Sequence, residues 1–244
     1  MKAILCTICM RSGSQGVKNK NLKFINGRPL MYYTIKQAIK TKLFDNIMVS
    51  TDSKKILSIA KSYGAEGWFL RSKRLASNTC SKMLVLKHAL KESEKFYNKK
   101  FDLIVDLDVT SPLRRVDDII NAYKSFIKSK GDVLITGSKS KKNPYFNVVE
   151  LKNKKLKKSK YFRKKIFRRQ DAPKTYDLNA SIYIYRRNLL INSKSTIGAL
   201  EANSKSKAIL FEMPESRSVD IDSEFDFKLV EFLLKKKNDK KLLV

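Results

Sequence analysis

Short apolar runs alternate with amphipathic stretches over roughly the first 140 residues, and this alternation limits the folds open to the chain. Apolar runs of four to eight residues between turn signals are typical of buried β-strands, whereas apolar residues three and four apart are typical of helices. Strands are expected at residues 3–9, 46–50, 65–70, 102–108 and 132–137. Helices are expected between them, at residues 30–41, 54–63, 81–97 and 116–129. This order predicts a three-layer α/β fold, a mostly parallel sheet with helices on both faces.

The pattern changes beyond this region. Residues 146–151 and 156–167 are expected to form hairpin strands with a very basic face, and two more strands are expected at 179–185 and 208–213. The closing helix is expected to bury a stripe made of Phe225, Leu229, Phe232 and Leu233. We interpret residues 139–178 as a β-rich excursion from the sheet and as a candidate for dimer contacts. Because neither repeats nor flexible linkers interrupt the chain, residues 1–244 are expected to form a single domain.

The formal charge of +30 comes from 53 lysine and arginine residues against 23 acidic ones, and the basic residues are densest between 139 and 174. Such an excess favours binding of a polyanion or attraction of an anionic substrate. It equally fits a solvated surface, since lysine occurs in nearly every segment. No nucleic-acid module is recognised, and aromatic residues do not alternate with the basic run as base stacking requires. We therefore expect no nucleic-acid partner.

Other features exclude further classes. No stretch approaches the ~20 apolar residues of a membrane helix, and the N-terminus lacks the layout of a signal peptide. A cytoplasmic protein without a membrane partner is expected. Cys6, Cys9 and Cys80 suggest no disulfide framework and are expected to be reduced. The chain has a single histidine, His88, which argues against histidine-dependent catalysis and against a histidine-rich metal site.

The loop at residues 10–21 follows the first predicted strand and carries glycines, serines and several cations. Gly13 and Gly16 allow the backbone to approach a ligand, and successive N–H groups in such a turn can bind an anion. Arg11 and Lys20 add donors that phosphate oxygens favour. A polyphosphate at the carboxyl end of the first strand is the preferred interpretation. An ordinary glycine turn with solvated lysines is the alternative, since neither standard glycine-rich fingerprint fits.

Acidic residues form a second group. Asp106 and Asp108 lie near a strand end, and Asp220 and Asp222 precede the last helix. The carboxyl ends of the strands of an α/β sheet lie at one edge, so these groups are expected to lie close together. Cations that bind phosphate and carboxylates that bind Mg²⁺ are the residue types needed for phosphoryl or nucleotidyl transfer. Asp220 and Asp222 could equally be residues that cap the helix.

Several segments together resemble the acylneuraminate cytidylyltransferases, the CMP-sialic acid synthetase family, in order and over nearly the whole chain. They are Arg11-x-Gly13-Ser14-x-Gly16 closing at Lys20-Asn21, Thr110-Ser111-Pro112-Leu113-Arg114, Arg169-Gln170, Asn179-x-Ser181-Ile182-Tyr183-Ile184 and Asp220-Ile221-Asp222. Four segments look especially like the branch that activates bacterial nonulosonates such as legionaminic acid: Val17 to Asn21, Asp106-Leu107-Asp108, Arg169-Gln170-x-Ala172-Pro173-Lys174 and Asn179-Ala180-Ser181.

The resemblance implies a Rossmann-like nucleotidyltransferase that joins CTP to a nine-carbon 2-keto sugar acid, with Mg²⁺ as cofactor and a homodimer as the assembly. It implies these CTP-binding residues: Arg11, Ser12, Gly13, Ser14, Gln15, Lys20, Asn21, Arg71, Asn78 and Thr79. Arg11, Lys20 and Asp222 would carry catalysis. The metal ligands would be Asp220 and Asp222, with Asp108 as a further candidate. The sugar would meet Asp108, Tyr145, Arg169, Gln170, Tyr176 and Asn179.

Two departures from the family pattern leave alternatives open. Gln15 stands where the family often has lysine, and Asp108-Val109 where it often has Gln-Pro. Asp108 could therefore bind metal or read a different sugar substituent. Pseudaminate or 3-deoxy-octulosonate transfer, a polyanion-binding protein without turnover, and an inactive relative are the rival interpretations. All versions of the enzyme hypothesis require the residue 10–21 loop and the acidic pair to face one cleft.

Overall fold

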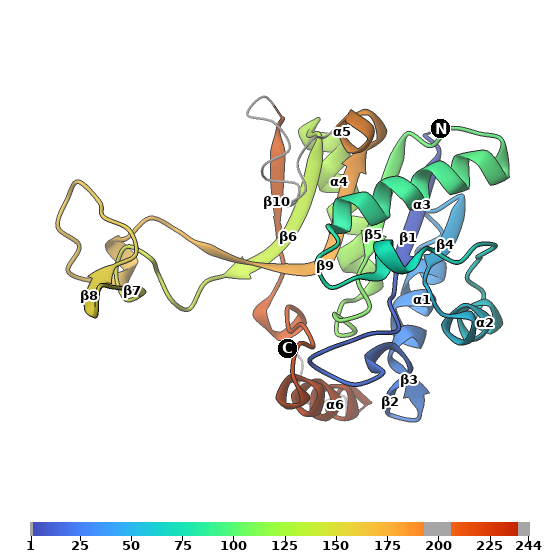
Figure 1. Cartoon of the computed structure of the whole chain (residues 1–244). Helices are drawn as coiled ribbons and strands as arrows, with labels where there is room; N and C mark the ends of the chain where they lie inside the picture. The colour runs from blue at the N-terminus through green and yellow to red at the C-terminus, as the bar shows by residue number, and fades with distance from the viewer. Residues whose placement is uncertain (1, 193–205, 239–244) are drawn as a thin grey trace.

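A six-stranded sheet forms the centre of the structure, a computed structural model that describes residues 2–192 and 206–238 (Figure 1). The strands stand in the order β10-β6-β9-β5-β1-β4. Their bounds are β1 Ile4–Cys9, β4 Asn46–Ser50, β5 Leu103–Leu107, β6 Val133–Lys139, β9 Tyr176–Arg186 and β10 Ala208–Glu212. β9 runs antiparallel to β5 and β6, whereas the other neighbours in this sheet are parallel. The predicted mostly parallel sheet is confirmed.

Helices pack on both faces of this sheet (Figure 1). Their bounds are α1 Leu30–Thr41, α2 Lys54–Ser62, α3 Lys82–Tyr97, α4 Val116–Ser129, α5 Arg187–Asn192 and α6 Glu224–Asn238. Alternate side chains of β1 point to opposite faces, so Cys6 and Ile8 join the core under α1 and α4 while Leu5 joins the core under α3. A strand covered on both faces is apolar throughout, which explains the continuous run at residues 3–9.

The loop after β1 leads into a short hairpin that begins α1. β2 Phe24–Ile25 pairs antiparallel with β3 Arg28–Pro29. Between them, Asn26 and Gly27 have φ of 46° and 73°, and positive φ at both central residues is the mark of a type I′ turn. The Asn-Gly signal in the sequence therefore marks a real reversal of the chain.

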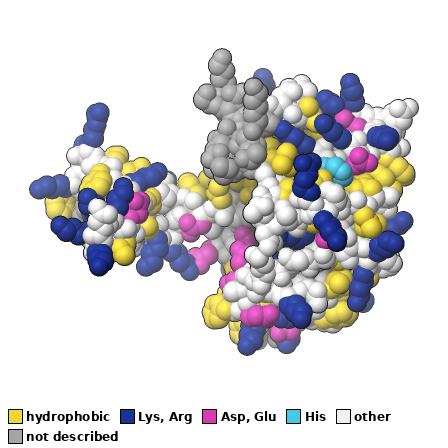
Figure 2. Space-filling view, viewed as in Figure 1, with side chains coloured by type: hydrophobic (Ala, Val, Ile, Leu, Met, Phe, Trp, Pro, Cys, Tyr) yellow, Lys and Arg dark blue, Asp and Glu magenta, His cyan; other side chains and the backbone are white. Residues whose placement is uncertain are grey.

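An arm projects from the sheet between β6 and β9. The two strands continue past the body as an antiparallel ribbon that pairs Lys139 with Tyr176, and a register shift lies between Ile135 and Gly137. At the far end, β7 Val149–Lys152 and β8 Lys155–Lys158 form a separate hairpin (Figure 1). Lysine and arginine side chains gather on this arm (Figure 2), and apolar residues such as Leu151 and Leu156 are about 70% exposed there.

Three expectations about elements need correction. Residues 65–70 form no strand beyond a bridge of Glu66 with Met48, because the chain then turns to pack Trp68 and Phe69 against α3. The arm strands are shorter than 146–151 and 156–167, and every residue of β7 and β8 is exposed, so no core packing extends them. In α6 the buried stripe is Phe227, Val230 and Leu234, whereas Phe225 is 74% exposed and Phe232 is 53% exposed.

Three long helices end on residues other than glycine in the left-handed conformation. Lys42 after α1, Asn98 after α3 and Lys130 after α4 have φ of 54°, 47° and 52°. Such ends usually carry glycine, because a Cβ is strained there. The chain has only 8 glycines, and these helix ends do without them.

The three cysteines are free thiols, with Cys6 buried and Cys9 and Cys80 partly buried. Among residues 2–192 and 206–238, no helix has the length and apolar character needed to cross a membrane.

Candidate active site

The loop after β1 lies over the carboxyl ends of the parallel strands. Its start is fixed where the Met10 N–H donates to the Ser50 carbonyl of β4 (2.9 Å), and its end where the Asn21 side-chain amide donates to the Arg11 carbonyl (2.9 Å). A cavity of about 450 Å³ opens beside this loop. Its lining includes these predicted residues: Arg11, Ser14, Gln15, Lys20, Asn21, Arg71, Asn78, Asp108 and Asp222. Cations and carboxylates predicted from distant segments thus share one opening.

The loop and the acidic segment before α6 are in direct contact. A Cβ added at Gly16 would lie 1.8 Å from the Asp222 carbonyl oxygen, so only glycine permits this approach. The Lys20 ammonium donates to the Ile221 carbonyl and lies 3.6 Å from an Asp222 carboxylate oxygen. The loop after β1 and Asp222 therefore line one cavity, whereas Asp220 is not among its lining residues.

The two aspartates of this segment have different surroundings. The Asp222 side chain is 84% exposed and lines the cavity. Asp220 is more enclosed, where it accepts hydrogen bonds from the Ser111 hydroxyl and the Ala180 N–H (3.1 Å). Burial raises the pKa of Asp220 above its ordinary value, and a nearby cation would oppose that shift.

Within the described residues, no three histidine, cysteine or acidic side chains cluster as a metal site. Mg²⁺ is commonly held by one or two carboxylates together with substrate phosphates and waters. The exposed Asp222 carboxylate beside a cationic loop fits that mode of binding. Asp220 fits it less directly, because Ser111 and Ala180 already occupy both of its oxygens.

A lysine that the sequence analysis did not single out lies at the centre of the second acidic group. The Lys82 ammonium, at the first turn of α3, is 2.7 Å from Asp106 and 2.8 Å from Asp108. Burial alone would raise the pKa of Asp108, but Lys82 and hydrogen bonds from Thr110 lower it to about 2. The lysine had no local signal in the sequence, since its partners follow 24 and 26 residues later, on β5 and just after its end.

Arg114 holds the backbone at Asp108 in place. Its side chain is fully buried and donates to the Asp108 carbonyl (3.3 Å), to the Thr34 hydroxyl (3.0 Å) and to the Ser181 carbonyl. Burial lowers the pKa of Arg114 to about 10. The Thr-Ser-Pro-Leu-Arg motif thus ends in a residue that ties α1, β9 and the end of β5 together.

Several predicted nucleotide contacts have internal partners. The Ser12 N–H and hydroxyl donate to Asp52 at 2.9 and 2.6 Å. The Arg11 guanidinium donates to the Asn78 side chain. Gly13, in the loop after β1, and Thr79, in the loop before α3, are not among the residues that line the cavity. Arg71 lines it but is only 6% exposed.

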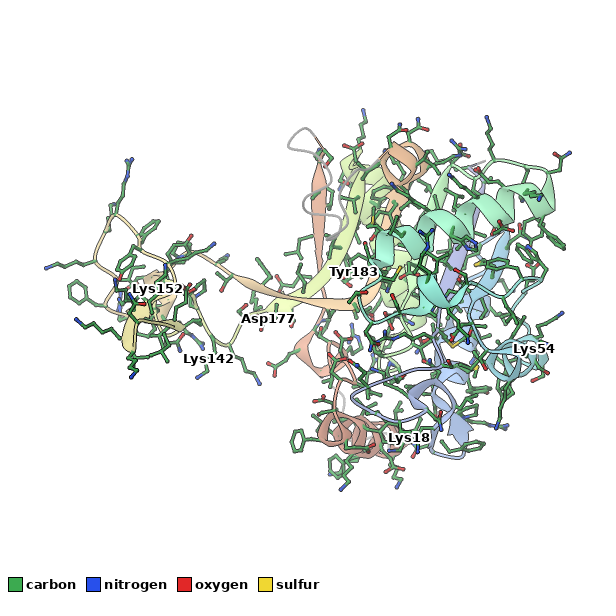
Figure 3. The ribbon with its side chains drawn as sticks, in the orientation of Figure 1. Lys18, Lys54, Lys142, Lys152, Asp177 and Tyr183 are labelled. Carbon is green, nitrogen blue, oxygen red and sulfur yellow. The ribbon has the colours of Figure 1, made fainter. Side chains whose placement is uncertain are left out.

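The predicted sugar-binding residues are not brought together in one chain. Tyr145, Arg169 and Gln170 lie in the arm segment, where Arg169 donates to the Lys141 carbonyl (2.7 Å). Figure 3 shows the arm, labelled at Lys142 and Lys152, extending away from the body that holds Tyr183. Tyr176 begins the ribbon, and Asn179 is buried against the Thr136 hydroxyl. Of the predicted sugar set, only Asp108 lines the cavity.

A mostly parallel α/β sheet whose first loop places cations against an acidic segment across one cleft defines a nucleotidyltransferase-type protein. A solved structure titled as CMP:2-keto-3-deoxy-manno-octonic acid synthetase complexed with CTP has this fold, with a TM-score of 0.70 at 16% identity over 96% of this chain and 99% of the other. Residues 5–235 match the family model described as Cytidylyltransferase. The chain belongs to the cytidylyltransferase family.

Curated relatives match over almost the full length. The chain is 47% identical to a CMP-N,N'-diacetyllegionaminic acid synthase of Campylobacter jejuni, over 98% of this chain and 97% of the relative. It is 46% identical to a post-translational flagellin modification protein B of Campylobacter coli, with the same coverage. An N-acylneuraminate cytidylyltransferase of Escherichia coli is 31% identical, and there the match spans 98% of this chain but 54% of the relative.

Proposed function

We propose that this cytidylyltransferase joins CMP to a nine-carbon 2-keto sugar acid of the legionaminate or neuraminate type. The contact of Gly16 and Lys20 with the 221–222 backbone carries this proposal, because it sets phosphate-binding and acidic groups around one cavity. The 47% identity to a CMP-N,N'-diacetyllegionaminic acid synthase supports the choice of sugar acid. We propose that residues 1–244 act as one catalytic unit in the cytoplasm, where CTP is available.

In this reaction the anomeric hydroxyl of the sugar acid attacks the α-phosphorus of CTP. The bond to the bridging oxygen breaks, pyrophosphate leaves with the electron pair, and the hydroxyl proton passes to water. Arg11 and Lys20 hold the phosphates and neutralise the charge that builds on the leaving group. The loop N–H groups and Asn21 would fix the triphosphate, and Arg71 and Asn78, which also line the cavity, would contact the nucleoside.

We further propose Mg²⁺ as the cofactor. Asp222, with Asp220 beside it, would hold the ion, which supplies charge neutralisation on the triphosphate when bound. Asp108 was expected either to bind metal or to contact the sugar, and we propose that it contacts substrate. The Lys82 ammonium lies 2.8 Å from Asp108 and repels a second cation from that carboxylate.

We propose a homodimer in which the arm, residues 139–178, reaches the partner. The distance of the arm from the cavity in one chain supports this arrangement, because Arg169 and Gln170 could meet a sugar carboxylate only in a second copy. The exposed apolar residues of the arm, including Leu151 and Phe167, are the kind of surface that an oligomer buries.

The function is tested by measuring pyrophosphate release from each of the four NTPs, crossed with legionaminic, neuraminic, pseudaminic and 3-deoxy-octulosonic acids, with and without Mg²⁺. We expect turnover with CTP, with legionaminic acid preferred, and loss of turnover in EDTA that Mg²⁺ restores. Turnover only with another sugar acid would replace the substrate assignment. Tight RNA binding without any turnover would favour a polyanion-binding protein instead.

A further inference from the structure

Lys82 is held between two carboxylates that differ in access to the cavity. Asp106 is 1% exposed, and its other oxygen accepts a hydrogen bond from the Thr7 hydroxyl (2.8 Å). Asp108 is 21% exposed and the Lys82 side chain is 37% exposed, and both line the cavity. The buried carboxylate therefore anchors the lysine, while the other two groups face the space where substrate is proposed to bind.

Lys82 and Asp108 keep a hydrogen-bond donor and an acceptor that their contacts with each other and with Thr110 do not use. One oxygen of Asp108 accepts from the Thr110 N–H and hydroxyl at 3.1 and 3.0 Å, which uses both of its lone pairs. The other oxygen accepts from Lys82 alone among these contacts and keeps a lone pair. The Lys82 ammonium has three N–H groups; one is donated to Asp108, while Asp106 is held as an ion pair at 2.7 Å, so at least one N–H group remains for a ligand. A free acceptor and a free donor are thus left 2.8 Å apart at the cavity wall.

We propose that Lys82 and Asp108 together recognise a substrate hydroxyl, making Lys82 a specificity-determining residue of the proposed reaction. A hydroxyl group is the chemical match, because its oxygen can accept from the ammonium while its hydrogen is donated to the carboxylate. A secondary amide is a poorer match, since its N–H and C=O point in opposite directions. Both the ribose of CTP and the sugar acid carry hydroxyls, so the pair reads one of these two partners.

A purely structural role for Lys82 would be to neutralise Asp106 in the core. Removing the lysine alone would leave that buried carboxylate unpaired, and the variant could fail to fold. The double variant Lys82→Met/Asp106→Asn avoids this difficulty. It removes the ammonium and the buried charge together and leaves the net charge of the group unchanged. Lys99→Met, which removes a lysine from a surface pair with Asp45 (3.4 Å), is the matched control.

The test compares kcat/KM for CTP, 2′-deoxy-CTP and 3′-deoxy-CTP, and for the accepted sugar acid and its monodeoxy analogues. Because the inference rests on the proposed function, CTP and deoxy-CTP binding is also measured by calorimetry, which needs no turnover. We expect the unchanged protein to discriminate against one analogue by at least about tenfold, as for a hydroxyl bonded to charged groups. In the double variant that discrimination should fall to within about twofold, while Lys99→Met keeps it.

Loss of discrimination in the nucleotide series would assign the ribose, and loss in the sugar series would assign the sugar acid. A uniform fall in kcat/KM for every substrate, with all ratios kept, would overturn the proposal and leave Lys82 a structural residue. Lys82→Arg provides a further check, since an arginine that retains the donor should retain part of the discrimination in the same series. If the unchanged protein shows no turnover with any sugar acid, calorimetry with the two deoxy nucleotides still decides the ribose case.

Discussion

Arg11 and Asp222 come from opposite ends of the chain and line the same cavity, one on the loop after β1 and the other before α6. Neither is buried, so each is free to act on a ligand rather than on the core. Their charges are opposite, as the two sides of a metal-bound triphosphate require. At the scale of single residues, the proposed chemistry depends on these two and on Lys20 between them.

Replacement of Arg11 or Asp222 by alanine should lower kcat by at least about 100-fold, the usual cost of removing one electrostatic donor or metal ligand. The fold should be unaffected, because Asp222 is exposed and Arg11 is only partly buried in a surface loop. Steady-state pyrophosphate release measures the effect, with Arg28→Ala, at an exposed arginine on β3, as the control. A rate close to that of the unchanged protein in either variant would remove that residue from the mechanism.

Asp108 should make stability depend on acid pH. Its pKa of about 2 lies below the value near 3.9 of an unfolded chain, so the unfolded state binds the proton more tightly. Its contribution, on the order of 2 kcal/mol, is complete above about pH 4 and is lost as pH falls toward 2. Urea unfolding from pH 5 to 2 should show a shallower fall for Asp108→Asn than for Asp117→Asn, an equal change at an exposed site. Equal slopes would contradict the Lys82 pairing.

The residues that sequence reasoning found and missed differ in a physical way. The cationic loop and the Asp220–Asp222 pair were predictable because each is a contiguous run of one chemistry next to a strand or helix end. Lys82 was missed because its partners, Asp106 on β5 and Asp108 just after it, approach the lysine only in the folded sheet. Asp108 drew attention as a departure from the family pattern, but its lysine partner could not be inferred.

At the scale of elements, the alternation of strands and helices predicted the sheet well, because each buried strand needs an apolar run that the sequence displays. The errors fall where an element lacks that constraint. Within residues 65–70, Trp68 and Phe69 are apolar because they pack on α3, and the sequence pattern alone could not separate this from a strand. In α6, surface aromatics such as Phe225 obscured the true buried stripe.

The contact between the β1 loop and the segment before α6 depends on one glycine. Gly16→Ala should force these two elements apart, because the new Cβ would overlap the Asp222 carbonyl, whereas a Cβ at Gly13 meets nothing within 4 Å. We expect Gly16→Ala to lose at least about tenfold more kcat/KM for CTP than Gly13→Ala. Similar losses in both would mean that the approach of the two elements is not needed for activity.

At the scale of the whole molecule, the arm separates the predicted sugar contacts from the cavity of the same chain. If the arm completes a partner's site, two inactive variants with defects in different parts should complement each other. Arg11→Ala spoils the cavity side and Arg169→Ala the arm side. A mixed dimer would then contain one site built from two intact halves.

Co-expression of these two variants should restore about a quarter of the activity of the same amount of unchanged protein. Half of randomly paired dimers are mixed, and one of the two sites in each mixed dimer is intact. Two cavity-side variants, Arg11→Ala with Asp222→Ala, should restore nothing and serve as the control. Complementation that is absent from the first mixture, with dimers confirmed by ultracentrifugation, would show that Arg169 acts within its own chain or not at all.

The lysines that end α1 and α4 offer a way to raise the thermal stability of this protein. Lys42 and Lys130 are exposed and keep a strained backbone that glycine would adopt freely. Exchanging both for glycine should relieve about 1 kcal/mol each and raise the melting temperature by a few degrees, readable by calorimetry. Both positions lie outside the cavity lining, so the more stable variant should keep the kcat of the unchanged protein.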